Sequence, residues 1–270
     1  MYEEFYGLKE RPFSKTPDPR FLFLSRSHRE ALARLQYAVE ERDIVLLTGE
    51  IGCGKTTLSR ALTDALDEQY RVMLIINPRL TPLEFLRNLA LRLDIVEPSR
   101  FKTDLLEQIG TALYGFYEQG ICPVLVVDEA QLVPHKETFD EIRLLTNFQL
   151  DDRNLLSVVL IGQGELRQRL RHRAYEPLRQ RIGMQYDLQP LDRGEVAEYL
   201  DFRVVTAGGV PGLFSAAATD LLYRYSGGIP RKINHAAALA LLEGFGRESR
   251  TIDEAVLESV MLELETLPLG

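Results

Sequence analysis

The sequence is poor in cysteine, has no long hydrophobic run and carries no excess of positive charge. Only two cysteines occur among 270 residues, which is too few for a disulfide framework, so reduced thiols are expected. The longest apolar stretch, Ile121 to Val127, is much shorter than the roughly 18 to 20 residues that a membrane helix needs. The formal net charge of −8 argues against a surface built broadly to hold nucleic acid.

The N-terminus also lacks the features of an export signal. Its first residues, Met1 to Phe5, are acidic and aromatic, whereas a secretory signal begins basic and continues as an apolar segment. Together with the missing membrane helix and the expected reduced thiols, this predicts a cytoplasmic protein. With 45% hydrophobic and 27% charged residues, the chain is an ordinary globular one, long enough for one large domain or two modest ones.

Short β-branched runs alternate with stretches of helical periodicity, which is typical of a parallel sheet with crossover helices. The expected strands are Ile44 to Thr48, Val72 to Ile76, Val124 to Asp128, Ser157 to Ile161 and Met184 to Leu188, with expected helices at 56–70, 82–93 and 102–119. Beyond residue 190 only helical periodicity remains, with expected helices at 193–207, 215–226, 230–244 and 252–264. The sequence therefore predicts an α/β domain at 44–190 and a small all-helical domain at 191–270.

An aromatic leader, interrupted by prolines, lies ahead of the first expected strand. It runs from Tyr2 to Leu24 and is followed by an expected helix from about Ser27 to Glu41. The leader is too apolar to be a free tail. We therefore expect residues 1–43 to be packed on the core of the α/β domain.

A glycine-rich segment joins the first expected strand to the first expected helix. The pattern G-x-x-x-x-G-K-[ST] is satisfied by Gly49-Glu-Ile-Gly-Cys-Gly-Lys-Thr56, in the strand-loop-helix context that it requires. Glycines let the backbone turn so that its N–H groups and the helix N-terminus face phosphate groups. Lys55 would reach the β- and γ-phosphates, and Thr56 would coordinate Mg²⁺. The segment predicts ATP and Mg²⁺ as cofactors, with the nucleotide bound by Gly49, Glu50, Ile51, Gly52, Cys53, Gly54, Lys55, Thr56 and Thr57.

An acidic pair, Asp128 and Glu129, follows the third expected strand. Asp128 would hold Mg²⁺, and Glu129 would polarise the attacking water as general base. Such a pair is also typical of a turn or a helix N-terminus, and its catalytic interpretation depends on the phosphate loop. After the next strand, Gln163 is expected either to contact the γ-phosphate or orient the water, or to be a turn residue that caps the following helix.

The strongest local excess of positive charge is the run from Arg167 to Arg181. It contains six arginines and one glutamate. One interpretation is a solvated helix face or a contact between subunits, and the other is a nucleic-acid contact. The acidic charge of the whole chain favours the first.

With these motifs in this order, the sequence resembles the AAA+ ATPases, most closely the ExeA/GspA family of secretion ATPases and its relatives in MSHA-pilus and exosortase loci. The resemblance covers nearly the whole chain. Besides the phosphate loop, it rests on Tyr6-Gly-Leu-Lys-Glu-Arg-Pro-Phe13, Thr16-Pro-Asp-Pro19, Asp128-Glu-Ala-Gln131, Leu160-Ile-Gly-Gln163, Leu178-Arg-Gln-Arg-Ile182 and Ser226-Gly-Gly-Ile-Pro-Arg231. It implies a P-loop NTPase of AAA+ type, an α/β fold with a five-stranded parallel sheet flanked by helices and followed by a small helical lid domain.

The resemblance also implies roles for three further residues. Gln163 matches sensor 1, Arg231 matches the sensor 2 arginine that reaches the phosphates, and Arg181 matches the arginine finger, with Arg179 as the alternative. A finger supplied to a neighbouring subunit implies that catalysis needs assembly. The expected state is a homo-oligomer, a ring or short helix and in the first instance a hexamer, formed when ATP is bound. For both arginines a surface salt bridge is the alternative.

Two features set limits on what the resemblance implies. The leader residues Phe5, Phe13, Phe21 and Phe23 would either wall the adenine pocket or pack under the sheet, and we expect packing with an adenine contact at one or two positions. The sequence ends at Gly270 without the transmembrane and peptidoglycan-binding parts of full-length ExeA/GspA proteins. We therefore expect a stand-alone motor or switch, peripheral to the inner membrane only through a partner.

Two functions fit the sequence. The first is an ATPase that energises or regulates assembly of a secretion, pilus or exopolysaccharide export apparatus through a protein partner. The second is an ATP-dependent DNA-binding regulator like the transposition ATPases TnsC and MuB. The acidic charge and the leader favour the first, while the basic run from Arg167 to Arg181 keeps DNA as the alternative partner.

Overall fold

The chain divides into two compact units in a computed structural model, which describes residues 1–14, 18–150 and 153–266. The first, which we call the sheet unit, comprises residues 28–49 and 58–188. The second, the helical unit, comprises residues 1–27, 50–57 and the described residues from 189 onward. The phosphate loop is therefore grouped by its contacts with the helical unit.

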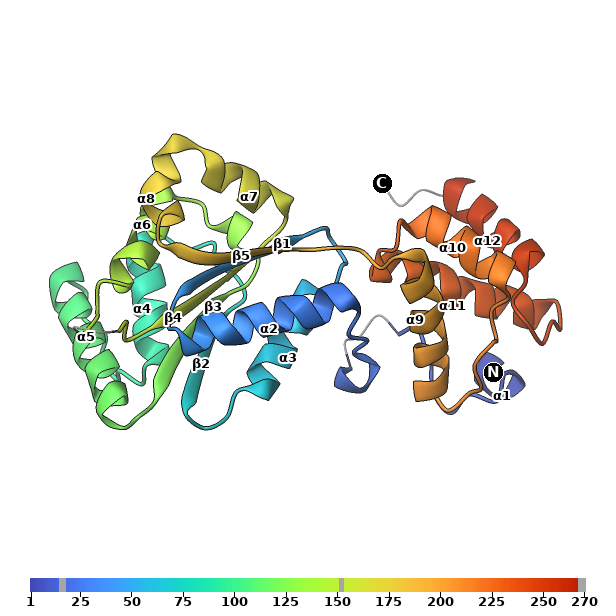
Figure 1. The fold of residues 1–270 in the computed structure, drawn as a ribbon, viewed down its shortest axis with the longest axis horizontal. Coiled ribbons are helices and arrows are strands. Elements are labelled where there is room, and N and C mark those ends of the chain that lie inside the picture. Colours follow the sequence, from blue (N-terminus) through green and yellow to red (C-terminus); the bar gives the residue numbers. More distant parts are fainter. Residues whose placement is uncertain (15–17, 151–152, 267–270) are drawn as a thin grey trace. The chain divides into compact units, whose positions relative to one another are not determined.

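The sheet unit contains a parallel sheet in the order β2-β3-β4-β1-β5 (Figure 1). Its strands are β1 (Ile44–Gly49), β2 (Tyr70–Ile75), β3 (Cys122–Val127), β4 (Ser157–Ile161) and β5 (Ile182–Leu188). The prediction of a five-stranded parallel sheet is confirmed. Because all strands are parallel, their carboxyl ends meet at one edge, and β4 lies between β1 and β3 at that edge.

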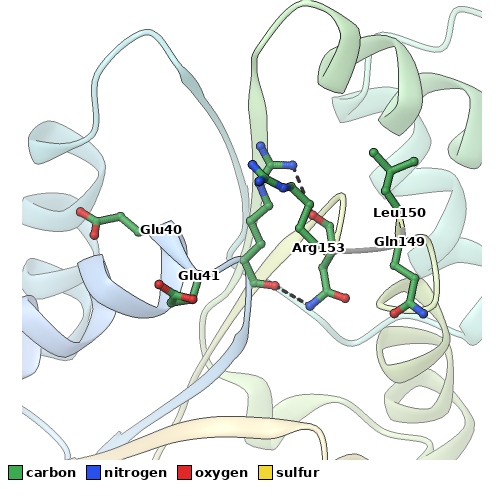
Figure 2. A pocket seen from close by; sticks show the side chains of 7 residues that line it. Glu40, Glu41, Gln149, Leu150 and Arg153 are labelled. Atoms are coloured by element: carbon green, nitrogen blue, oxygen red, sulfur yellow. Dashed lines mark hydrogen bonds between the residues drawn. The ribbon is translucent and has the colours of Figure 1, made fainter.

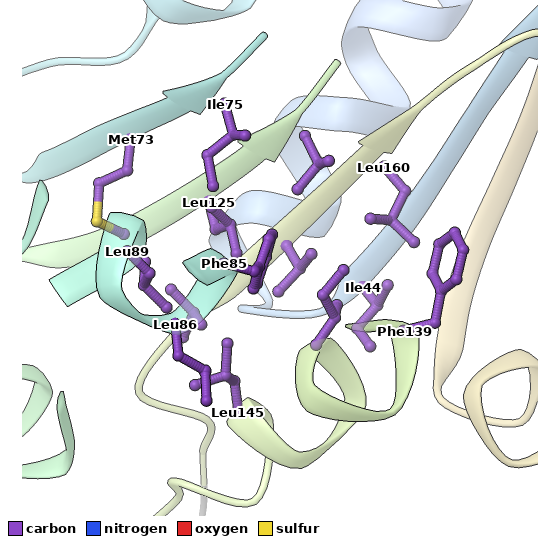
Figure 3. Packing of buried hydrophobic residues seen from close by; sticks show 14 of the residues in the cluster. Ile44, Met73, Ile75, Phe85, Leu86, Leu89, Leu125, Phe139, Leu145 and Leu160 are labelled. Carbon is purple, nitrogen blue, oxygen red and sulfur yellow. The ribbon is translucent and has the colours of Figure 1, made fainter. Parts of the chain in front are cut away.

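Alternate strand residues point to opposite faces of the sheet, and helices cover both faces. Ile44, Met73 and Leu125 point to one face, where they form a core with Phe85 of α4 and Phe139 of α6 (Figure 3). Helices on this face are α4 (Pro82–Arg92), α5 (Lys102–Glu118), α6 (Lys136–Leu145), α7 (Gly164–Arg171) and α8 (Glu176–Arg179). Helices α2 (Arg26–Glu40) and α3 (Lys55–Ala65) lie on the other face (Figure 1).

Short 3₁₀ segments occur at three places in the described chain. They are η1 (Pro19–Phe21), η2 (Ala130–Leu132) and η3 (Arg173–Tyr175). Only Asp128 and Glu129 separate η2 from β3, so η2 carries the residues after Glu129 across the carboxyl edge of the sheet.

The helical unit is built from four long helices and the leader. The helices are α9 (Arg193–Thr206), α10 (Ala216–Ser226), α11 (Pro230–Gly246) and α12 (Glu254–Thr266). They begin and end within a few residues of the expected positions, because their caps are local: Ser215 accepts from the N–H of Ala218, and Gly227 ends α10 with φ +60°. In the described part of the chain, no helix is both long and apolar enough to cross a membrane.

The leader belongs to the helical unit, which corrects the expectation that it packs on the α/β core. Tyr2 of α1 (Tyr2–Phe5), Leu8, Phe13 and Phe21 are buried among residues of α9 to α12. The backbone N–H of Lys9 donates to the carbonyl of Ala207 (2.8 Å). The four helices leave apolar area that these side chains cover, whereas α2 lies on the sheet. Thr16 and Pro17 of the leader motif lie outside the described residues.

A buried arginine holds the leader against α9. The side chain of Arg203 donates to the carbonyl of Pro12 (2.6 Å) and to the hydroxyl of Tyr199 (3.3 Å). Its guanidinium also lies 4.7 Å from the centre of the Phe21 ring, a distance at which cation–π attraction acts. The leader is therefore fixed by hydrogen bonds and ring contacts as well as by apolar burial.

Replacing Phe13 by alanine tests this placement. The ring is 4% exposed and packs edge-on against Phe214 at 5.8 Å between centroids, so Phe13→Ala should lower the free energy of unfolding by about 3 kcal/mol. Urea denaturation followed by circular dichroism measures this value. The control Phe101→Ala removes a ring that is 73% exposed and should change it by less than about 0.5 kcal/mol. Equal effects of the two substitutions would contradict the buried leader.

Candidate active site

The phosphate loop leaves the sheet at the end of β1 and enters α3 at Lys55. Gly52 and Gly54 have φ of +87° and +100°, values that glycine adopts without steric cost. The loop can therefore curl at the N-terminus of α3, and the N–H groups at a helix N-terminus favour an anion. Lys55 is only 7% exposed, and its Nζ donates to the carbonyl of Glu50 (2.8 Å). The lysine is thus held within the curve of the loop. Cys53 is buried there.

The start of α11 packs directly on this loop, within the helical unit. The backbone N–H of Arg231 donates to the carbonyl of Gly52 (3.3 Å). A Cβ at position 52 would lie 2.6 Å from Cβ of Arg231 and 3.2 Å from Cγ2 of Ile229. Gly52 is therefore required both for its positive φ and for this close approach. Arg231, expected from the sequence to reach the phosphates, is exposed beside the loop.

A tight bend fixes the start of α11. Gly227 and Gly228 have φ of +60° and +77°, and a Cβ at Gly228 would lie 1.9 Å from the carbonyl oxygen of Leu191. The N–H of Leu191 donates to the carbonyl of Gly228 (2.9 Å). The segment that contains the two glycines thus anchors α11, and with it Arg231, to the segment that precedes α9.

The acidic pair lies at the carboxyl end of β3, in the sheet unit. Asp128 is 2% exposed; its N–H donates to the carbonyl of Ile75 (2.9 Å), and its Oδ1 accepts from the N–H of Glu129 (2.8 Å). Glu129 has φ +53° and ψ +39°, a left-handed conformation that is uncommon for a residue with a side chain. The chain thus turns two residues after the end of β3.

Two glutamine amides converge on the carboxylate of Glu129. The Nε2 atoms of Gln131 and Gln163 both donate to Oε2 of Glu129, the latter at 3.3 Å. The Oε1 of Gln131 accepts from the backbone N–H of Gln163 (3.1 Å). Gln163 occupies the N-cap position of α7, but its side chain makes no capping hydrogen bond. Its side chain therefore bonds to Glu129 instead of capping α7.

Gln131 was not among the site residues that the sequence predicted. It was noted only as the last residue of the motif Asp128-Glu-Ala-Gln131. The signal that could have found it is its place two residues after the acidic pair, on the segment that crosses the edge of the sheet toward β4. Only the structure shows that both ends of its side-chain amide form hydrogen bonds.

The two candidate finger arginines are both exposed at the end of α8. A terminal nitrogen of Arg181 donates to Oδ1 of Asn147 (3.2 Å), and one of Arg179 donates to the carbonyl of Arg171 (3.0 Å). Among the described residues, neither arginine forms a salt bridge with a carboxylate. The alternative of a surface salt bridge is therefore not supported.

The basic run around these arginines is not a uniform positive face. Arg169 donates to the hydroxyl of Tyr175 (2.8 Å) and lies 5.1 Å from the centre of the Phe139 ring, so it connects α7 to η3 and α6. Arg167 faces the carboxylate of Asp187 at 3.5 Å. The exposed members of the run are Arg171, Arg173, Arg179 and Arg181.

The expected metal ligands are of the type that Mg²⁺ prefers. Thr56 and Asp128 offer a hydroxyl and a carboxylate oxygen. Within the described ranges, no group of three or more His, Cys, Asp or Glu side chains is gathered to hold a metal ion. Mg²⁺ is usually bound by one or two protein oxygens together with substrate phosphates and water.

The sheet unit has a further pocket that contains none of the motif residues. It measures about 510 Å³ and is lined by Glu40, Glu41, Arg42, Gln149, Leu150, Arg153 and Asn154 (Figure 2). These residues precede β1 and β4, at the amino ends of the strands. The amide of Asn154 donates to the carbonyl of Arg42 (2.9 Å) across it. The pocket therefore lies at the other end of the strands from the acidic pair.

Most of the chain is similar in sequence to a known protein. Residues 38–170 match the model of an AAA domain. The chain is 42% identical over 256 residues to General secretion pathway protein A of Aeromonas hydrophila, a match that covers 93% of this chain. The chain spans 46% of the length of that relative.

Solved structures share the fold at low sequence identity. The ORC2 protein of Aeropyrum pernix is 16% identical with a TM-score of 0.64, covering 94% of this chain and 72% of that one. Cdc6p of Pyrobaculum aerophilum is 16% identical with a TM-score of 0.66, covering 93% and 70%. The Holliday junction motor RuvB of Thermotoga maritima is 20% identical with a TM-score of 0.59, covering 90% and 70%. These similarities concern the fold alone.

Proposed function

Because the chain is an AAA ATPase related to General secretion pathway protein A, we propose that it hydrolyses ATP with Mg²⁺ in an oligomer and thereby drives or times the assembly of an export apparatus. The observation that carries the hydrolytic part is the carboxylate of Glu129, oriented by two amides at the edge of the sheet. A left-handed glutamate held in this way is suited to act on a water rather than to close a turn.

The phosphates are proposed to bind at the curled loop before α3. Backbone N–H groups and Lys55 would neutralise their charge. Arg231 would add a guanidinium from the start of α11, which packs on Gly52 of the same loop. The start of α11 would thus respond to whether a nucleotide is bound, because it contacts the loop at Gly52.

Mg²⁺ is proposed to bind through Thr56 and Asp128 together with the β- and γ-phosphates. When bound, the ion neutralises charge that develops on the phosphoryl oxygens. Asp128 is buried, and its backbone is fixed by the carbonyl of Ile75, so its carboxylate has a defined position.

Glu129 is proposed to accept the proton of the attacking water. Its Oε2 receives both amide donors, which leaves Oε1 as the atom to accept from water. Gln163 would sense the γ-phosphate, since it begins α7 beside the carboxylate.

Oligomerisation is proposed to complete the site. Arg181, with Arg179 as the alternative, is exposed and could enter the site of a neighbouring subunit, where its planar guanidinium would stabilise the transferring phosphoryl group. We propose a ring or short helix, with a hexamer as the first state to test.

The biological role is proposed from the relationship to General secretion pathway protein A. We place the oligomer in the cytoplasm, where ATP is available, and at the inner membrane through a protein partner of a secretion, pilus or exopolysaccharide system. DNA is the less favoured partner, because four of the six arginines in the basic run form hydrogen bonds or an ion pair within the sheet unit.

Two substitutions test the hydrolytic site. Glu129→Gln should retain ATP binding but lower kcat about 100-fold or more, because the amide cannot accept the proton. Lys55→Ala should instead weaken ATP binding at least about tenfold, through loss of a charged contact to phosphate. Phosphate release and isothermal titration calorimetry measure the two effects. The matched control Glu258→Gln, at an exposed position of α12, should behave as wild type. Undiminished turnover of Glu129→Gln would remove this residue as the base.

Mixed oligomers test the shared site. Arg181→Ala and Glu129→Gln should each be inactive alone, but a mixture should recover part of the turnover, because Glu129→Gln subunits can supply Arg181 to intact Glu129 in their neighbours. Turnover is measured against the mixing ratio at fixed total protein. A mixture that stays as inactive as its components would argue against an arginine supplied by a neighbouring chain. Arg179→Ala in the same assay decides between the two arginines.

A further inference from the structure

The side chain of Gln131 connects two segments of the site through opposite ends of one amide. It lies in η2, which only Asp128 and Glu129 separate from β3. Its Nε2 donates to Oε2 of Glu129, and its Oε1 accepts from the backbone N–H of Gln163 (3.1 Å), a residue 32 positions further along the chain. Both hydrogen-bonding ends of the amide are thus used within the site.

We propose that Gln131 is a positioning residue for ATP hydrolysis, which orients the carboxylate of Glu129 and links it to the backbone of Gln163. This inference rests on the proposed role of Glu129 as general base. An amide suits the task because it is planar, so that the positions of its donor and acceptor are fixed relative to each other. It is also uncharged, so it does not compete with water as a source of protons.

The space for this amide depends on a glycine. A Cβ at Gly162 would lie 2.8 Å from Oε1 of Gln131 and 2.6 Å from Cδ2 of Leu166. The N–H of Gly162 is bound to the carbonyl of Leu47 (3.0 Å), so the backbone at this point is fixed to β1. The amide of Gln131 therefore lies against a part of the sheet edge that has little freedom to move.

The arrangement would carry a signal from the phosphate to the base. Gln163 bonds the cluster twice, through its backbone N–H to Gln131 and through its side chain to Glu129. When Gln163 turns toward a γ-phosphate, its side-chain bond to Glu129 has to change. The Gln131 amide then keeps the carboxylate in place, because it holds Oε2 independently of the Gln163 side chain. Without Gln131, Glu129 would lose this support when it acts.

Three substitutions of Gln131 separate positioning from simple packing. Gln131→Met keeps the length but removes both hydrogen bonds, and we expect kcat to fall about 10- to 100-fold with KM for ATP changed less than about twofold. Gln131→Glu keeps the acceptor for the Gln163 N–H but faces Glu129 with a second carboxylate. We expect it to be less active than Gln131→Met. Gln131→Asn, one methylene shorter, should be intermediate between Gln131→Met and wild type.

The order of the kcat values of the Gln131 variants decides whether Gln131 positions Glu129. If Gln131 only receives the Gln163 N–H, Gln131→Glu should be as active as wild type and more active than Gln131→Met, which would overturn the proposal. Equal kcat for all variants would overturn it as well. Single-turnover rates with ATP and Mg²⁺ measure the chemical step in the full chain. The control Gln168→Met, at an exposed position of α7, should match wild type, and thermal unfolding confirms that each variant is folded.

Glu129→Gln, measured beside these variants, distinguishes failure of the base assignment of Glu129 from failure of the positioning role of Gln131. If Glu129→Gln is inactive while Gln131→Met turns over as wild type does, only the positioning role fails. If Glu129→Gln turns over normally, the base assignment fails and the positioning role fails with it. If both roles are correct, adding Gln131→Met to Glu129→Gln should cost much less than it costs in the wild-type chain, because the group that it positions is already disabled.

Discussion

The parallel alignment of β1, β4 and β3 is the constraint on which the proposed site depends. Backbone hydrogen bonds hold the three strands in register, with Leu47 beside Ile161 and Val127 beside Leu160. Each strand ends at the same edge, so the phosphate loop, the acidic pair and Gln163 all begin there. The hydrogen bonds among Glu129, Gln131 and Gln163 can form only because β3 and β4 are neighbours.

A second constraint acts in the helical unit, where glycines allow backbone segments to meet. Gly52 lets the start of α11 reach the phosphate loop, and Gly228 lets the preceding bend reach Leu191. The leader completes the core of this unit through Phe13, Phe21 and Arg203. The part of the protein that presents Arg231 to the loop is therefore stabilised by residues from both ends of the sequence.

Local patterns made the strands, the phosphate loop and the acidic pair predictable, because each is encoded in a few consecutive residues. The leader could not be placed in this way: aromatic residues such as Phe13 show that burial is needed, but not which surface provides it. Nor could the sequence distinguish Arg169, held by Tyr175, from exposed Arg181. Gln131 was missed because its role depends on the distance to Gln163, which only the folded sheet sets.

ATP turnover per chain, measured against protein concentration with and without duplex DNA at low and moderate salt, tests the central claim of a shared hydrolytic site most directly. The account predicts that turnover per chain rises with concentration, because assembly supplies the arginine, and that DNA leaves it unchanged. Turnover per chain that is independent of concentration would contradict a site completed by a neighbour. Strong stimulation by DNA that fades as salt rises would contradict the export role and favour a DNA-bound ATPase.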